Sequence, residues 1–184
     1  MKLEVNNLKK SYGEKLVLDD IDFSFESGKI YGLIGRNGAG KTTFFNSLNS
    51  DIDIDSGSFY LEDEYGKNSL STNDIGYVVS TPIVPEFLTA REFLEFFMEI
   101  NKDKVDKDKT VDDYFSLVQI SREDQDKLLK DYSHGMKNKM QLLIHIISNP
   151  KVILLDEPLT SFDIVVQDEM KKLFLVIGAP GSGK

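Results

Sequence analysis

Short apolar runs separated by polar turns occupy the two ends of this chain, and apolar residues at helical spacing occupy its middle. The short runs are rich in Val, Ile and Phe, which favours strands. The run at 152–155 is apolar without alternation, as expected for a parallel strand covered on both faces. The strands that we predict are Leu3 to Val5, Val17 to Phe25, Lys29 to Ile34, Gly57 to Leu61, Gly76 to Val79, Val152 to Leu155 and Leu173 to Ile177.

The segment from 83 to about 148 has a helical pattern. Thr89 and Glu92 have the spacing of a capping box, which predicts a helix start. A second helix is predicted from near Thr110, and a third follows Ser133 and must end before Pro150. The apolar residues expected on the buried faces are Phe93, Leu94, Phe96, Phe97 and Ile100, then Tyr114, Phe115, Leu117 and Val118, then Met136, Met140, Leu143 and Ile147.

Length and composition narrow the class of protein. A chain of 184 residues fits one domain, or one domain with a small subdomain. The formal charge of -9 gives no overall attraction to nucleic acid or anionic lipid. The chain has no cysteine, which excludes disulfides and thiolate metal sites, and no apolar run is long enough to cross a membrane.

The stretch GRNGAGKT, from Gly35 to Thr42, has the spacing G-x-x-x-x-G-K-[ST] of a phosphate-binding loop, also called Walker A. It follows a predicted strand and precedes a predicted helix, TTFFNSL, as that motif requires. Glycines let backbone N–H groups turn towards phosphate oxygens, Lys41 is expected to reach the β and γ oxygens, and Thr42 to bind Mg²⁺. The nucleotide-binding residues predicted here are Gly35, Asn37, Gly38, Ala39, Gly40, Lys41, Thr42 and Thr43.

Asp156 and Glu157 directly follow the buried run at 152–155. A carboxylate at the carboxyl end of such a strand is placed to bind the Mg²⁺ shell, which makes Asp156 a candidate metal ligand. Glu157 is then placed to polarise the attacking water, so Glu157 and Lys41 are the candidate catalytic residues. Such an acidic pair also occurs at ordinary strand ends. The prediction is strong only because the same chain contains the phosphate-binding loop that begins at Gly35.

These motifs resemble the nucleotide-binding subunit of an ATP-binding cassette (ABC) transporter, over residues 1 to about 172. The resemblance implies an α/β fold: a P-loop NTPase core with a mixed or parallel sheet, N-terminal antiparallel strands and an inserted helical subdomain. It implies ATP and Mg²⁺ as cofactors and an ABC-type ATPase that dimerises around them. It also implies a permease and a second nucleotide-binding subunit as partners, no nucleic acid, and a cytoplasmic location at the inner face of the cell membrane.

The resemblance assigns further residues and boundaries. Tyr12 in KKSYGEK takes the place of an adenine-stacking aromatic residue. Ser133 and Gly135 in YSHGMKNKM take the place of the signature turn, which reaches the γ-phosphate held by the other subunit. Asp163 in LTSFD takes the place of an Asp in the loop after Walker B, which in the family connects the two nucleotide sites of the dimer. The expected domains are a core at 1–82 and 149–177, a helical subdomain at 83–148 and a Gly-rich tail at 178–184.

The chain departs from the family pattern at three points. Ser80 stands where the family usually has Gln, and its shorter side chain cannot reach Mg²⁺ and water from the same backbone. His134 replaces the first signature glycine, where it either adds bulk beside the facing nucleotide or points to solvent. No histidine follows His145, although the family ends a later strand with one that contacts the γ-phosphate. These departures leave a second interpretation open. In it the chain is a regulatory module, or a fragment without the γ-phosphate histidine, that binds nucleotide but is impaired in hydrolysis.

The final residues, LVIGAPGSGK, resemble the opening strand and loop of nucleoside monophosphate kinases. No Ser or Thr follows Lys184 to bind Mg²⁺, and no helix follows to supply its N-terminal dipole. We therefore expect a strand and a Gly-rich tail left by truncation or fusion, and no second nucleotide site.

Overall fold

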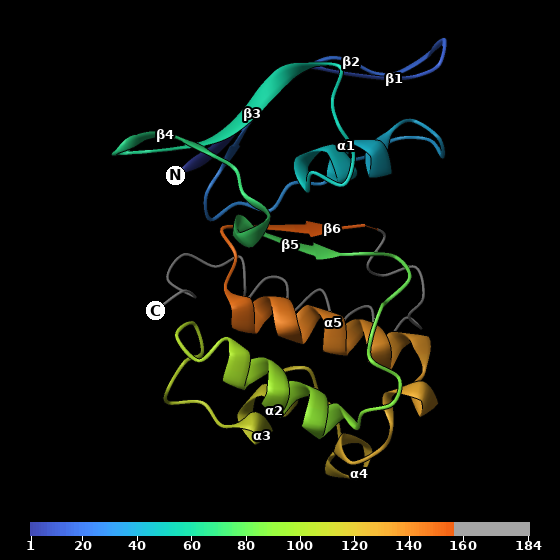
Figure 1. Ribbon diagram of the computed structural model, residues 1–184, viewed down its shortest axis with the longest axis vertical. Coiled ribbons are helices and arrows are strands. Elements are labelled where there is room, and N and C mark those ends of the chain that lie inside the picture. The colour runs from blue at the N-terminus through green and yellow to red at the C-terminus, as the bar shows by residue number, and fades with distance from the viewer. Residues whose placement is uncertain (157–184) are drawn as a thin grey trace. The chain divides into compact units, whose positions relative to one another are not determined.

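The structure is a computed structural model, in which residues 1–156 are described (Figure 1). Its backbone forms two compact units, the first comprising Met1–Ile75 and the second beginning at Gly76. The strand predicted at Leu173 to Ile177 and the tail predicted at 178–184 lie outside the described residues.

The first unit contains an antiparallel sheet of β1 (Lys2–Tyr12), β2 (Lys15–Glu26), β3 (Ser56–Asp63) and β4 (Gly66–Ser69). The strand order is β2-β1-β3-β4, and each neighbouring pair is antiparallel. Three of the strands confirm sequence predictions, including the antiparallel N-terminal arrangement. β4 was not predicted, because its sequence GKNS has no apolar residue and all four positions are exposed.

Helix α1 (Lys41–Leu48) packs on β2 and confirms the helix predicted after the phosphate loop. Phe44 is buried on its inner face, and the Phe44 and Phe25 ring centroids are 6.3 Å apart. The sheet and this helix thus enclose the core of the first unit, whose buried apolar residues include Leu3, Val5, Leu8, Leu18, Phe44, Leu48 and Leu61.

The strand predicted at Lys29 to Ile34 is wrong, because residues 29–36 form no helix or strand. Tyr31 folds back on β2 instead: its ring lies edge-on to Phe25 at 5.1 Å, and its hydroxyl accepts a hydrogen bond from the Glu26 backbone N–H at 3.0 Å. An apolar run becomes a strand only when another backbone pairs with it. No described strand pairs with this one.

Strand β5 (Ile75–Val78) begins at the last residue of the first unit and continues into the second unit. It forms a two-stranded sheet with β6 (Val152–Leu155), and the two strands run in the same direction (Figure 1). The Asp156 backbone N–H continues this pairing by donating to the Val78 carbonyl at 3.0 Å. The helices of this unit are α2 (Ala90–Ile100), α3 (Val111–Leu117), α4 (Arg122–Gln125) and α5 (His134–Ser148). Short 3-10 turns lie at Thr72–Asp74 in the first unit and Leu129–Asp131 in the second.

Side-chain caps begin the three predicted helices where expected. The Thr89 hydroxyl accepts from the Glu92 N–H at 3.1 Å, and the Glu92 carboxylate accepts from the Thr89 N–H at 2.8 Å, which confirms the capping box. Ser133 caps α5 by accepting from the Met136 N–H at 3.2 Å. The left-handed Asn149 ends that helix one residue before Pro150.

Helix α5 lies between the β5–β6 pair and α2, and it carries the centre of this unit's core (Figure 1). Met140, Leu143 and Ile147 are buried, as their spacing predicted. Two expected core residues of α2 are exposed instead: Phe96 lies on the flank of the buried face, and Ile100 lies in the last turn. The apolar face of α2 is therefore narrower than predicted and is centred on Phe93 and Leu94.

Candidate functional site

The phosphate loop is shaped by two glycines with left-handed backbones. Gly38 has φ of 78° and Gly40 has φ of 96°, a region that other residues adopt only with strain. A Cβ on Gly40 would lie 3.0 Å from Val17 Cγ1 and 3.1 Å from the Val17 carbonyl oxygen. The structure requires glycine at position 40 for two reasons: the left-handed backbone angle and the close approach of β2.

Lys41 begins α1 directly after this loop. Its ammonium group donates to the carbonyl oxygens of Gly35 at 3.0 Å and Arg36 at 3.3 Å, so the side chain folds back over the loop. The next residue, Thr42, is exposed at the same helix end. A cation, a helix N-terminus and a hydroxyl thus meet at one loop, and this donor set suits a phosphate with an associated Mg²⁺.

Tyr12 lies at the end of β1, in the hairpin that brings β2 to the loop. Tyr12 on β1 is the strand partner of Lys15 on β2. Two residues along β2, Val17 packs against the backbone at Gly40. The Tyr12 side chain is 51% exposed, and the Lys10 ammonium lies 5.4 Å from its ring centroid. An exposed aromatic ring in the same hairpin as the loop's packing partner fits the predicted contact with a base.

Asp156 follows β6 in the second unit and is only 7% exposed. Its backbone is held by the Val78 carbonyl, so the residue starts at the carboxyl ends of two parallel strands. This is the edge at which α/β sheets place ligand-binding groups. Glu157 and Asp163, which the sequence assigned to catalysis and to the link between sites, lie outside the described residues.

Ser133 and Gly135 flank His134 at the start of α5. The His134 side chain is exposed, yet it does not merely point to solvent: its Nε2 lies 3.1 Å from the Ser80 carbonyl oxygen. Two of the three departures noted in the sequence are therefore in contact. Each departure was visible from the sequence, but nothing in the spacing of residues 80 and 134 indicated that they meet.

A second histidine holds the other end of α5. His145 Nε2 lies 3.1 Å from the Tyr77 carbonyl oxygen, and burial lowers the pKa of His145 while the bond to Tyr77 acts in the opposite direction. Gly76 makes this approach possible, because a Cβ there would lie 3.1 Å from His145 Cγ and 2.9 Å from Pro150 Cγ. Sequence analysis missed this role, since one histidine in an apolar helix carries no signal of its partner.

Residues 18–160 match the ABC transporter family, a range that includes the phosphate loop, Ser133 and Asp156. The chain belongs to this family. An uncharacterised ABC transporter ATP-binding protein of Methanocaldococcus jannaschii is 34% identical over 89% of this chain. The lantibiotic transport ATP-binding protein SrtF of Streptococcus pyogenes is 30% identical over 93% of it. The chain spans 59% of the length of the first relative and 72% of the second.

Solved structures agree with the ABC fold. A putative ABC transporter ATP-binding protein from Pyrococcus furiosus has a TM-score of 0.80 at 25% identity, covering 96% of this chain and 86% of that one. A dimeric ATP-binding cassette bound to ADP and Pi has a TM-score of 0.78 at 20% identity, covering 99% and 84%. The predicted α/β fold class, with antiparallel N-terminal strands and inserted helices, is thereby confirmed.

The described part of this ABC chain has no ready-made metal cage. Among residues 1–156, no three His, Asp or Glu side chains come together as a cation site. None of the helices within 1–156 is long and apolar enough to span a bilayer.

Proposed function

We propose that this chain is the ATP-binding and ATP-hydrolysing subunit of an ABC transporter. The observation that supports the proposal most is the loop at 35–42, where two left-handed glycines precede a helix that starts at Lys41. Backbone N–H groups at such a helix start bind phosphate oxygens, and the Lys41 ammonium adds a full positive charge. ATP with Mg²⁺ is the ligand that fits this donor set.

The proposed roles follow from the chemistry of each side chain. Lys41 binds the phosphates, while Thr42 and Asp156 hold the magnesium shell, and bound Mg²⁺ supplies charge neutralisation at the transferred phosphoryl group. Tyr12 stacks on the adenine. Glu157 orients the attacking water and accepts its proton. Ser133 and Gly135 complete the site of a second subunit, so that hydrolysis requires a dimer.

The partners proposed are a membrane permease and a second nucleotide-binding subunit, at the cytoplasmic face of the membrane. Relatives named for the transport of a lantibiotic and of bacitracin support a transport role. A solved neighbour described as part of an ABC transporter complex supports assembly with other subunits. We favour export as the direction of transport, with peptides, drugs or ions as the substrate class.

The test is ATP binding and steady-state hydrolysis by the purified chain over a range of protein concentrations. We expect turnover to rise more than proportionally with protein, because each site needs a second subunit. Lys41→Ala should abolish ATP binding, whereas Lys107→Ala, which removes an exposed lysine elsewhere, should not. Glu157→Gln should bind ATP and form a dimer without turnover. Tight ATP binding by Lys41→Ala would refute the assignment.

The second candidate is a nucleotide-binding module that hydrolyses ATP slowly or not at all. Ser80 favours it, because a serine side chain is too short to orient water and metal as glutamine does. Binding of ATP by the wild-type chain without turnover, at every protein concentration, is the result that this candidate predicts.

A further inference from the structure

The chain contains two histidines, and both bind one short segment from one helix. His134 Nε2 lies 3.1 Å from the Ser80 carbonyl oxygen, and His145 Nε2 lies 3.1 Å from the Tyr77 carbonyl oxygen. Tyr77 belongs to β5, and Ser80 lies two residues beyond the end of that strand. Helix α5 is therefore attached near both of its ends to β5 and the residues that follow it.

The attachment at His134 lies at the functional end of α5. Residues 134 and 145 are separated by about three helical turns, so the two bonds act at different places. His134 is the first residue of the helix and stands between Ser133 and Gly135. Val78, close to Ser80 in the chain, accepts the Asp156 N–H through its carbonyl. The His134 bond thus connects the turn at 133–135 to the strand ends that carry Asp156.

The chemistry of this contact defines which imidazole nitrogen carries hydrogen. A backbone carbonyl is only an acceptor, so His134 must donate from Nε2. A nearby ion pair supports the same alignment: the Lys137 ammonium lies 2.7 Å from the Glu86 carboxylate, which joins the second turn of α5 to the loop that follows Ser80. A side chain of glutamine places an N–H donor at a similar distance from the backbone, whereas alanine has none.

We propose that His134 is a positioning residue, which holds Ser133 and Gly135 in the orientation needed to meet the nucleotide of a second subunit by donating a hydrogen bond to the Ser80 carbonyl. The inference rests on the proposed function, because it assumes a site completed across a dimer. His134 acts through the backbone and does not touch the nucleotide. The replacement of the first signature glycine by His134 then adds an internal hydrogen bond, to the Ser80 carbonyl, that a glycine could not form.

The experiment compares His134→Ala with His134→Gln in the full chain. Loss of one neutral hydrogen bond corresponds to about a two- to tenfold change, and we expect His134→Ala to lower kcat by that factor. His134→Gln should restore most of it. The ATP dissociation constant should be unchanged in both variants, because we propose that His134 makes no contact with the nucleotide bound by its own subunit. Lys130→Ala, an exposed lysine shortly before α5, is the matched control and should match the wild type.

Hydrogen exchange separates failure of this inference from failure of the proposed function, because it needs no hydrolysis. The Lys137 N–H, which bonds to the Ser133 carbonyl at 3.0 Å, should exchange faster in His134→Ala than in the wild type and His134→Gln. If the wild type binds ATP without turnover, kcat cannot be compared, and the exchange rate of the Lys137 N–H alone tests the role of His134. Equal exchange in all three proteins would overturn the inference, as would a Gln variant no better than Ala in kcat. A wild type that binds no ATP refutes the proposed function instead.

Discussion

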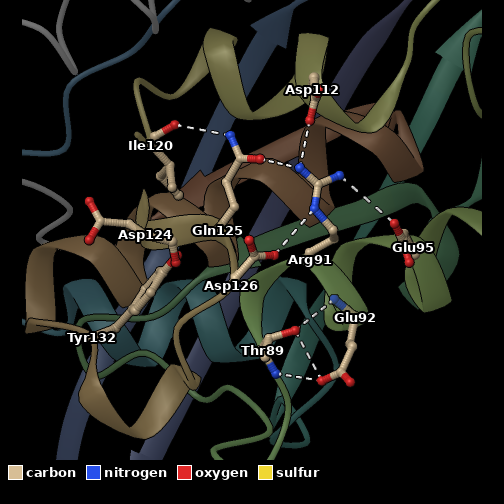
Figure 2. Close-up of polar contacts among 10 residues, drawn as sticks. All are labelled: Thr89, Arg91, Glu92, Glu95, Asp112, Ile120, Asp124, Gln125, Asp126 and Tyr132. Atoms are coloured by element: carbon tan, nitrogen blue, oxygen red, sulfur yellow. Dashed lines mark hydrogen bonds and ion pairs between the residues drawn. The ribbon is translucent and has the colours of Figure 1, made fainter. Parts of the chain in front are cut away.

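The guanidinium of Arg91 on α2 lies 2.7 Å from the carboxylate of Asp112 on α3, and it also donates to the amide oxygen of Gln125 on α4 (Figure 2). Gln125 is only 3% exposed, and its amide nitrogen donates to the Ile120 carbonyl at 3.4 Å. One arginine therefore connects the three helices α2, α3 and α4 through a partly buried set of polar contacts.

Replacing Arg91 with leucine should destabilise the second unit. The substitution leaves the buried Gln125 oxygen without its donor, and an unsatisfied buried acceptor costs about 1–3 kcal/mol. Urea denaturation should show a lower midpoint for Arg91→Leu. The control is Arg122→Leu, since Arg122 is exposed and forms no ion pair with any residue in 1–156. Equal midpoints for the two variants would show that the Arg91 contacts contribute nothing measurable.

The pH dependence of stability should report on His145. Burial lowers the pKa of His145 below the 6.5 of the free side chain, so the unfolded chain binds a proton that the folded chain resists. Its contribution is fully present above about pH 6.5 and is lost as pH falls towards the lowered pKa. The free energy of unfolding should therefore fall between pH 8 and pH 5.5 more steeply in the wild type than in His145→Gln. Parallel pH profiles would contradict the assignment.

Local signals in the sequence predicted helices α1, α2, α3 and α5 and most of the sheet, but not the short helix α4. Thr89 with Glu92, and Ser133 before an apolar period, mark helix starts through hydrogen bonds that form within one turn. Such contacts depend on residues only three positions apart, which is why they can be read from the chain. The shape of the loop at 35–42 was predictable for the same reason, because its left-handed glycines and the helix start at Lys41 lie within one short stretch.

Contacts between distant residues could not be predicted in this way. The apolar run around Tyr31 indicated a strand. Instead, the Tyr31 side chain packs against β2, where its ring contacts Phe25 and its hydroxyl accepts a hydrogen bond from the Glu26 N–H. The contact between His134 and Ser80 joins residues 54 positions apart, and it uses a backbone carbonyl that every residue possesses. Side-chain chemistry at one position gives no information about such a partner.

Gly40→Ala tests the shape of the phosphate loop. Gly40 has φ of 96°, and an added Cβ would lie 3.0 Å from Val17 Cγ1 and 3.1 Å from Leu18 Cδ2. A left-handed backbone alone costs a residue with a side chain about 1–2 kcal/mol. The crowding against β2 adds to that strain and forces the loop or the strand to move.

The control for Gly40→Ala is Gly13→Ala. Gly13 also has a left-handed backbone, with φ of 59°, but an added Cβ meets nothing within 4 Å. Both variants should lose stability from the backbone strain, and Gly40→Ala should lose more. Only Gly40→Ala should bind ATP more weakly, by about tenfold or more, since about 1.4 kcal/mol of displaced contacts corresponds to a factor of ten. Calorimetric titration with ATP decides between them. Equal ATP affinity in the two variants would mean that the loop binds phosphate without the backbone geometry of Gly40.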